Sequence, residues 1–346
     1  MHEAAEQIGG GTRTEELTLP GFRHDVCSAI HPLAYVSPVF RGLDVAWIHS
    51  PAVLAHPLDD GVELAWRRRR PAYGRALFAG CCAHSGQPIE HVASRGAGAT
   101  LLALAHTSGW PFPRGGSQAL ADALAARLRE HGGEIRTSSL VEEIPDADVV
   151  LCDTPPAFVG RSVGYGPGAF KLDWALEGPI PWRDERVPLA ATVHLGGRAD
   201  EISASERYPG SDRPFVILTQ PSLWDETRAP AGRHTAWAYC HVPNGSSRDL
   251  TEQVEAQVER FAPGFRDRIL ARSALTPREL EAHNRNLVGG DVNGGALTVR
   301  SVFAPGHRTS RRGVYLCSAS TRPGGGVHGL CGLLAARLAL RDLRDR

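Results

Sequence analysis

The chain opens with an acidic residue and a glycine run, and this order constrains its fold more than any other feature. Glu3 ends a very short first segment, and Gly9, Gly10 and Gly11 follow it closely. Glycines let backbone amides approach a phosphate because no Cβ intervenes, and an acidic side chain at a strand end can accept hydrogen bonds from ribose hydroxyls. The same residues also suit a frayed terminus and an ordinary turn, so both interpretations stay open.

A nucleotide-binding unit of this kind normally starts with a strand, a glycine-rich turn and a helix, and the acidic residue comes only after them. Almost no residues precede Glu3. We therefore expect that the first strand and its turn are missing from the chain as written, and that Met1 is a start read inside the second strand. An in-frame glycine motif upstream in the DNA is the observation that tests this expectation.

Charge and composition exclude several classes of function. The 346 residues include 38 Lys and Arg and 38 Asp and Glu, so the net charge is zero and predicts no nucleic-acid binding. Seven scattered cysteines predict mostly buried free thiols in a reducing, cytoplasmic compartment. No Cys and His spacing suits zinc, so no metal is expected. We expect no targeting segment and no membrane span, because no apolar run is long enough.

Hydrophobic periodicity predicts helices at 116–133 and 249–265, the first with Leu120, Leu124 and Leu128 on one face. Alternation and turn residues predict strands within 43–66, 134–144 and 146–156, and three strands of a second sheet at 187–197, 213–224 and 234–245. The tail, residues 313–346, is predicted to form a strand, a glycine loop and a helix.

Two later glycine turns lie directly before predicted helices. In GGGVHG (324–329) the free amides and the helix dipole favour an anionic ligand over a mere tight turn. In WPFPRGG (110–116) Gly115 and Gly116 let the next helix begin close to another group, and Arg114 suits a phosphate contact and a surface salt bridge equally. The sequence has no hydrolase nucleophile motif and no CxxC, and no histidine can be assigned as a catalytic base.

Seven segments occur here in the order found in one family. They resemble segments of the phytoene desaturase-like branch of FAD-dependent NAD(P)/FAD oxidoreductases, and the resemblance covers nearly the whole chain. The segments are GGGTRTEELTLPGF, GWPFPRGGSQALADALAARL, YGPGAFKLDWAL, RAPAGRHTAWAYCHVPNG, ERFAPGFRDRIL, HNRNLVGGDVNGG and YLCSASTRPGGGVHGLCG.

The resemblance implies an α/β fold with a discontinuous Rossmann-like FAD-binding domain, its first βα unit missing, and a mixed-sheet substrate domain. The FAD-binding domain would comprise 1–31, 112–160 and 300–346, and the substrate domain 32–111 and 161–299. The implied cofactor is FAD. The residues that resemble its binding site are Glu3 at the ribose, Gly9 and Gly10 beside the pyrophosphate, Val141 with its backbone at the adenine, and Gly325, Gly326 and Val327 in a loop that closes on the flavin.

The resemblance also implies an activity. In the family a hydride passes between an apolar C–H group and flavin, and the protein supplies position and a dry pocket. The implied partner is an apolar small molecule, isoprenoid or lipid-like. No side chain serves as acid or base throughout the family, so the catalytic residues stay unknown. Membrane association has no sequence support, and the oligomeric state stays open.

The chain departs from the family in two more places. Only RRRRPAYGR lies between GVELAW and ALFAG, where relatives carry a long helical segment, and PPAFVGRSVGYGPG joins two normally distant segments. We therefore expect weak or no FAD binding and a tendency to aggregate, because a sheet without its central strand exposes apolar faces. The alternative is a truncated, non-catalytic relative that binds a ligand or partner without FAD.

Overall fold

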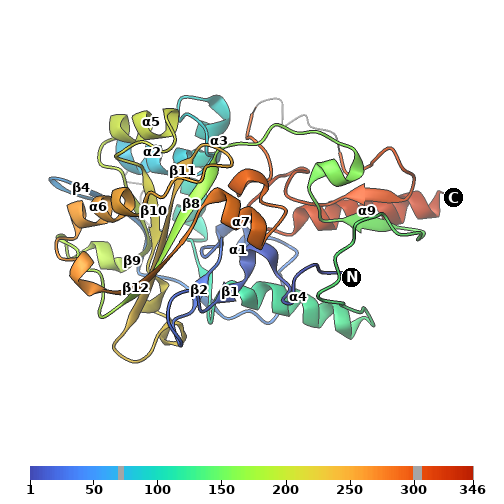
Figure 1. The fold of residues 1–346 in the computed structure, drawn as a ribbon, viewed down its shortest axis with the longest axis horizontal. Coiled ribbons are helices and arrows are strands. Elements are labelled where there is room, and N and C mark those ends of the chain that lie inside the picture. The colour runs from blue at the N-terminus through green and yellow to red at the C-terminus, as the bar shows by residue number, and fades with distance from the viewer. Residues whose placement is uncertain (69–73, 299–305, 346) are drawn as a thin grey trace.

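The structure is a computed structural model that describes residues 1–68, 74–298 and 306–345. Figure 1 shows an elongated molecule with a large sheet at one end. Helices α4 (Gln118–Glu130) and α9 (Leu330–Arg344) lie at the other end, close to the two chain termini. The helices predicted at 116–133 and in the tail are confirmed as α4 and α9.

Seven strands form one mixed sheet in the order β12, β8, β11, β10, β9, β4, β5. Neighbouring strands are antiparallel except β4 and β9, which are parallel. The sheet confirms the strands predicted in 43–66 and the three predicted for a second sheet. The bounds are β4 Ala52–Leu58, β5 Gly61–Ala65, β8 Gly168–Leu176, β9 Ala190–Leu195, β10 Val216–Thr219, β11 His234–Val242 and β12 Ile269–Leu275.

The two faces of this sheet differ in chemistry because side chains alternate along each strand. One face is the main hydrophobic core, where β8 and β11 pack against α6 (Thr251–Phe261). Val254, Val258 and Phe261 of α6 are buried there, which confirms the helix predicted at 249–265. The opposite face of β8 and β11 carries Lys171, Asp173 and other polar side chains, which are also buried.

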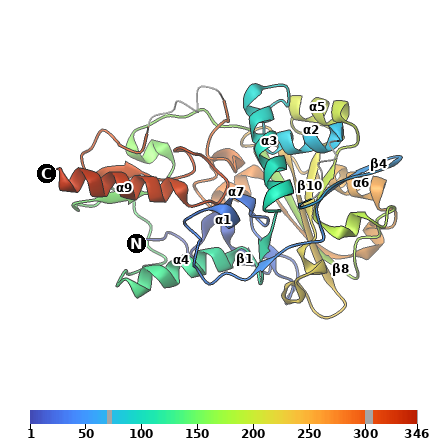
Figure 2. The ribbon, with the colours of Figure 1, turned by 180° about the vertical axis from the view of Figure 1, so that it is seen from behind.

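The remaining helices pack around the sheet, and α2 and α7 lie against its polar face. Helices α2, α3 and α5 lie together at one end of its strands (Figures 1 and 2). Helix α7 packs through Leu280 against Ala169 and Tyr239, on the polar face. The bounds are α1 Pro32–Val36, α2 Arg75–Ala83, α3 Val92–Thr107, α5 Ala199–Arg207 and α7 Pro277–His283, with short 3-10 turns that include η1 Gly10–Thr12.

Near the termini the parallel β-structure is divided into two separate pairs. His2 forms a parallel bridge with Arg136, and β7 (Val150–Cys152) pairs in parallel with β13 (Val314–Leu316). The second pair confirms a parallel strand within 146–156, but the strand is not buried as predicted, because Leu151 is exposed. The strand predicted over 134–144 is wrong beyond Arg136, because Ser138 adopts a left-handed backbone (φ 50°) that interrupts an extended chain.

Two small antiparallel pairs connect these parts. Strand β1 (Thr14–Glu15) pairs with β2 (His24–Asp25), and β3 (Trp47–Ile48) pairs with β6 (Phe112–Pro113). The first pair places β2 against the polar face of the large sheet, where Nδ1 of His24 lies 3.4 Å from Oδ1 of Asp173. Strand β6 leads directly into the start of α4.

Candidate functional site

Glu3 directly follows His2, which forms the parallel bridge with Arg136. Its amide donates to the carbonyl of Arg136 (2.8 Å), its carbonyl accepts from the amide of Ser139 (2.8 Å), and its Oε1 accepts from the amide of Ala5 (2.9 Å). Asp153 lies directly after β7. Burial and, to a smaller extent, the charge of Glu3 raise the pKa of the Asp153 carboxyl to about 6. The side chain of Asp153 nevertheless reaches solvent. Glu3 follows a parallel bridge and Asp153 follows a parallel strand, so each carboxylate lies at the carboxyl end of parallel β-structure.

Gly9 and Gly10 form a turn that packs on protein. Both have left-handed backbones (φ 118° and 52°), and the carbonyl of Gly9 accepts from the amide and hydroxyl of Thr12 (2.9 and 2.8 Å). A Cβ on Gly9 would meet Oε1 of Gln118 in α4 at 3.2 Å, and one on Gly10 would meet Asn284 at 3.1 Å. Gly9 is therefore required by close packing against α4, and Gly10 by close packing against Asn284, which follows α7.

Gly325, Gly326 and Val327 lie in the loop between β13 and α9. Gly326 and Val327 have left-handed backbones (φ 124° and 53°), and a Cβ on Gly326 would overlap Leu33 of α1. A Cβ on Gly325 would approach the carbonyl of Asn293 at 3.1 Å. This loop therefore packs on α1 and on residue 293, whereas Gly9 packs on α4 and Gly10 on Asn284.

Val141 is half-buried and lies outside regular structure. The chain from Arg136 to β7 crosses between the two parallel pairs, so Val141 does not continue the pairing of Glu3. Its proposed backbone contact with an adenine stays a prediction.

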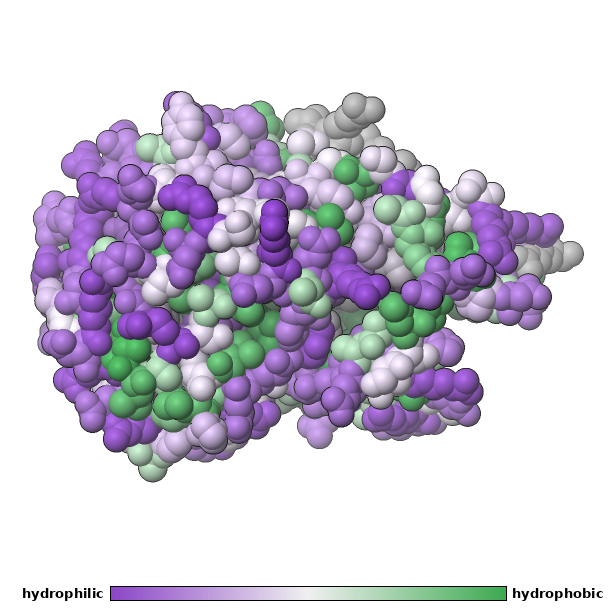
Figure 3. Space-filling view, viewed as in Figure 1, coloured by the Kyte–Doolittle hydropathy of each residue, from purple (hydrophilic) through white to green (hydrophobic). Residues whose placement is uncertain are grey.

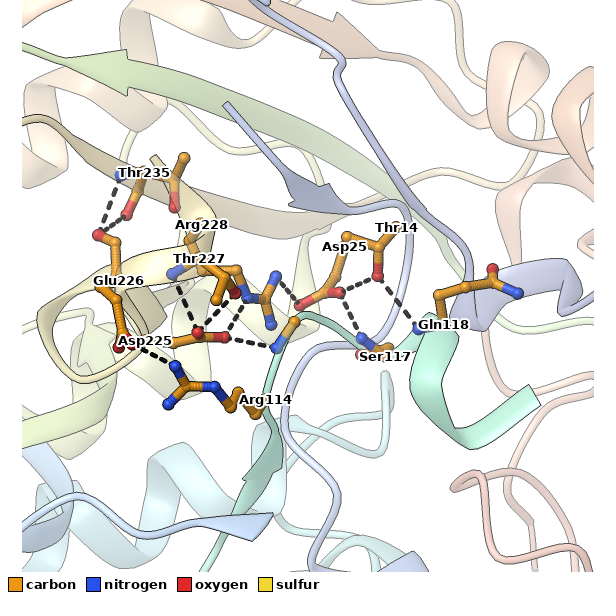
Figure 4. Close-up of polar contacts among 12 residues, drawn as sticks. Thr14, Asp25, Arg114, Ser117, Gln118, Asp225, Glu226, Thr227, Arg228 and Thr235 are labelled. Atoms are coloured by element: carbon orange, nitrogen blue, oxygen red, sulfur yellow. Dashed lines mark hydrogen bonds and ion pairs between the residues drawn. The ribbon is translucent and has the colours of Figure 1, made fainter. Parts of the chain in front are cut away.

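The N-terminus of α4 begins against a buried carboxylate. Oδ1 of Asp25 accepts from the amide of Ser117 (2.7 Å) and from the hydroxyl of Thr14 (2.8 Å), and that hydroxyl accepts from the amide of Gln118 (3.1 Å; Figure 4). A negative charge is favourable at this end of a helix. Gly116 allows the approach, because a Cβ there would overlap Thr14. The glycines before this helix were predicted to let it begin close to another group, and that group is Asp25.

Arg228 joins Asp25 to the loop before β11. Its Nη1 lies 3.0 Å from Oδ2 of Asp25 and its Nε 2.9 Å from Oδ2 of Asp225, and all three side chains are fully buried (Figure 4). Burial favours a higher pKa for Asp225, but hydrogen bonds from Thr227 and Gly115 and the charge of Arg228 outweigh it, so the pKa is lowered. Arg114, by contrast, forms an exposed ion pair with Glu226. Of its two predicted roles, the surface salt bridge is the one observed.

The buried polar face of the large sheet is the functional feature that sequence reasoning missed. Lys171 forms an ion pair with Asp173, and its Nζ lies 5.5 Å above the ring of Trp237. Burial raises the pKa of Asp173 to about 6 although Lys171 lowers it, and burial lowers the pKa of His24 to about 3. One signal was available, because Lys171 is the single lysine of the chain.

Three histidines extend this face toward β4. Nε2 of His84 lies 2.9 Å from Nε2 of His194, and Nε2 of His56 donates to the carbonyl of Gly197 (2.7 Å). Burial lowers the pKa of His84 to about 3 and that of His56 to about 4. Trp110 contacts His84 edge to face and lies tilted against His194. Beside it a cavity of ≈ 510 Å³ is lined by His49, Ser50, Pro51, Val53, Trp66, Arg67 and Trp110.

All seven cysteines are free and five are buried, as predicted. Burial raises the pKa of the Cys27 thiol to about 11, so it is unreactive as a nucleophile. Within the three described ranges, no group of three His, Cys, Asp or Glu side chains could hold a metal ion. In the same ranges no helix has the length and apolar character that crossing a membrane requires.

The fold and the site can now be compared with known proteins. No protein-family model matches the chain. Pyridine nucleotide-disulfide oxidoreductase domain-containing protein 2 of Rattus norvegicus is 28% identical over 68% of this chain and 52% of that protein. A neurosporene-forming phytoene desaturase of Rhodobacter capsulatus is 25% identical over 63% of this chain and 51% of the desaturase. The chain is a relative of phytoene desaturases.

These relatives confirm the resemblance drawn from the sequence and support an FAD-dependent oxidoreductase family. The chain spans about half the length of the curated relatives it matches. Among solved structures, an oxidoreductase from Methanosarcina mazei has a TM-score of 0.69 and 16% identity, covering 97% of this chain and 93% of that one. At this identity the likeness shows the fold alone, and it confirms the predicted α/β class with a large mixed sheet.

Proposed function

We propose that this chain is an FAD-dependent oxidoreductase polypeptide that moves a hydride between flavin and an apolar, isoprenoid or lipid-like substrate. The observation that supports it most is that Glu3 and Asp153 each lie at the carboxyl end of parallel β-structure. Ligands of α/β sheets bind at that edge, and the chain is related to phytoene desaturases. When bound, FAD supplies the hydride acceptor.

The described residues fit FAD in part. Glu3 is half-buried at a strand end and would accept hydrogen bonds from the adenosine ribose, and the loop 325–327 would lie beside the flavin. The diphosphate has a poorer site. Amides at the start of α4 already bond to Asp25 and Thr14, and the amide of Leu330 at the start of α9 donates to Nδ1 of His328 (3.0 Å). We therefore propose that this chain holds FAD weakly.

A titration of the purified chain with FAD tests the proposal. Flavin absorbance and fluorescence report binding, and particle size is followed in the same samples. Glu3→Gln should weaken FAD binding by roughly 30-fold, since a charge-assisted hydrogen bond contributes about 2 kcal/mol. Glu6→Gln is the matched control, because Glu6 is an exposed carboxylate in the same segment. Equal affinities for both variants, or no saturable binding by a monodisperse chain, would count against the proposal.

A second candidate function has its own support. The amides of Ser117 and Gln118 at the start of α4, and that of Leu330 at the start of α9, are occupied by the chain's own side chains, as expected of a relative that has lost its cofactor. We propose as the alternative a non-catalytic protein that binds a ligand or partner without FAD. A folded, monodisperse chain that shows no flavin binding but retains a ligand on the polar sheet face would favour this alternative.

A further inference from the structure

We propose that the buried polar face of the large sheet binds a hydroxyl group at the polar end of the substrate. This site is defined by Asp173 of β8, Trp237 of β11, Thr219 of β10 and Thr192 of β9. The inference deepens the proposed function and rests on it only for the apolar body of the ligand. It makes the substrate an alcohol with a lipid-like body, where the family resemblance by itself suggests a plain hydrocarbon.

These four residues form one row across the sheet. Asp173 pairs with Trp237, which pairs with Thr219, which pairs with Thr192. Directly opposite residues of neighbouring strands have their side chains on the same face and within contact distance. The row therefore places four polar side chains side by side, in the middle of a sheet whose other face is apolar.

Each residue of the row is buried and carries an atom without a hydrogen bond. Their exposed fractions are 0% for Asp173, 4% for Trp237 and 2% for each threonine. Nε1 of Trp237 and the two threonine hydroxyls have no hydrogen-bond partner among the described residues, and Oδ1 of Asp173 has only the 3.4 Å contact with Nδ1 of His24. Buried polar atoms nearly always form hydrogen bonds, so four atoms without one in a single row indicate a group that is absent from the polypeptide.

The chemistry of the four atoms defines that group. The indole N–H of Trp237 can only donate, an ionised Asp173 can only accept, and threonine hydroxyls do both. A carboxylate ligand cannot donate and would face the charge of Asp173, and an ammonium ligand cannot accept from Trp237. An alcohol hydroxyl donates and accepts at once, and it carries no charge to bury.

The surroundings suit an apolar body next to that hydroxyl. His194 lies on the same strand and face as Thr192, two residues further on, and its ring centroid is 6.2 Å from that of Trp110. Trp110 lines the cavity described above, together with Val53 and Trp66. A ligand body in that cavity therefore lies beside the sheet face that carries the row.

Geraniol is the probe, with geranyl methyl ether as the matched ligand that accepts a hydrogen bond but cannot donate one. Binding to the full chain is measured by calorimetry without flavin, so the result is independent of the proposed oxidoreductase activity. Thr219→Val and Trp237→Phe each remove an atom that has no partner and should fold. Trp182→Phe is the matched control, because Nε1 of Trp182 is already bonded to Oε1 of Gln220 (3.0 Å).

We expect geraniol to bind at least about fivefold more tightly than the ether, the worth of one hydrogen bond. Thr219→Val and Trp237→Phe should each weaken the binding of geraniol by about the same factor, while Trp182→Phe should leave it unchanged. Equal binding of both probes to all variants would overturn the inference, and the row would then hold only water. Geranamide, the matching primary amide, is a third probe. Tighter binding of geranamide than of geraniol would overturn the hydroxyl and indicate a primary amide in its place.

Discussion

Replacing Arg228 with Met should destabilise the protein far more than replacing Arg114 with Met. Both arginines pair with acidic residues of the same loop, but Arg228 is fully buried between Asp25 and Asp225, whereas Arg114 and Glu226 are exposed to solvent. Removing the cation of a buried pair costs about 3–5 kcal/mol, because the partner charge stays buried without compensation. An exposed pair contributes only about 0–1 kcal/mol.

The structure places Arg228→Met toward the lower end of that range, at about 3 kcal/mol. Asp25 keeps its bonds from Thr14 and Ser117, and Asp225 keeps those from Thr227 and Gly115. Urea unfolding at neutral pH, followed by tryptophan fluorescence and far-ultraviolet circular dichroism, measures the change in the free energy of unfolding.

The double variant Asp25→Asn with Arg228→Met should recover part of the lost stability, since one of the two buried carboxylates left without a cation is then removed. The reasoning is refuted if the Arg228 and Arg114 variants differ by less than about 0.5 kcal/mol, well inside the spread expected for surface pairs.

Three further predictions concern stability. Thr192→Val should raise the free energy of unfolding by about 1 kcal/mol, because it removes a buried hydroxyl that lacks a partner; a loss in urea unfolding would mean that the hydroxyl is satisfied. Burial lowers the pKa of His56 to about 4 against 6.5 when unfolded, so the stability it contributes is lost as pH falls from about 6.5 toward 4. In that window His56→Gln should reduce the slope of the free energy of unfolding against pH by about 1.4 kcal/mol per pH unit. Denaturation at several pH values measures this slope, and an unchanged slope would contradict the burial effect. Gly116→Ala should cost at least about 2 kcal/mol by thermal unfolding, from left-handed strain and overlap with Thr14; Gly115→Ala, with open space around it, should cost only the strain, and equal losses would exclude the overlap.

Apolar side chains near the termini bear on the expected aggregation. Exposed leucines gather on the helices and strands around the two parallel pairs, and Figure 3 shows hydrophobic side chains between α9 and α4. The sequence predicted a single apolar face for α4, but only Leu120 is buried there. The exposed fractions of Leu124 and Leu128 are 37% and 36%, so two of the three leucines on that face are exposed. Particle-size measurements on the purified chain test whether it self-associates. The exposed leucines of this region are Leu124, Leu128, Leu140, Leu151, Leu334, Leu340 and Leu343.

The sequence by itself determined the local elements, because their periodicity and turn residues are local properties. Helices α4, α6 and α9 and strands β9, β10 and β11 all lie where alternation and glycine or proline breaks predict them. It also determined the relationship to phytoene desaturases, since collinear segments survive at low identity. The prediction failed over 134–144, where an alternating pattern was overruled by the left-handed backbone of Ser138.

Tertiary structure alone decided which polar residues meet. Asp25 lies beside the start of α4 and Arg228 binds both Asp25 and Asp225, although these residues are far apart in the sequence. The row from Asp173 to Thr192 depends on the register of four strands, and no local pattern encodes register between distant segments. Polar residues that alternate with apolar ones along a strand ordinarily predict a solvent-facing side. Here a second layer of the fold buries that side, and for this physical reason the sequence did not reveal the site.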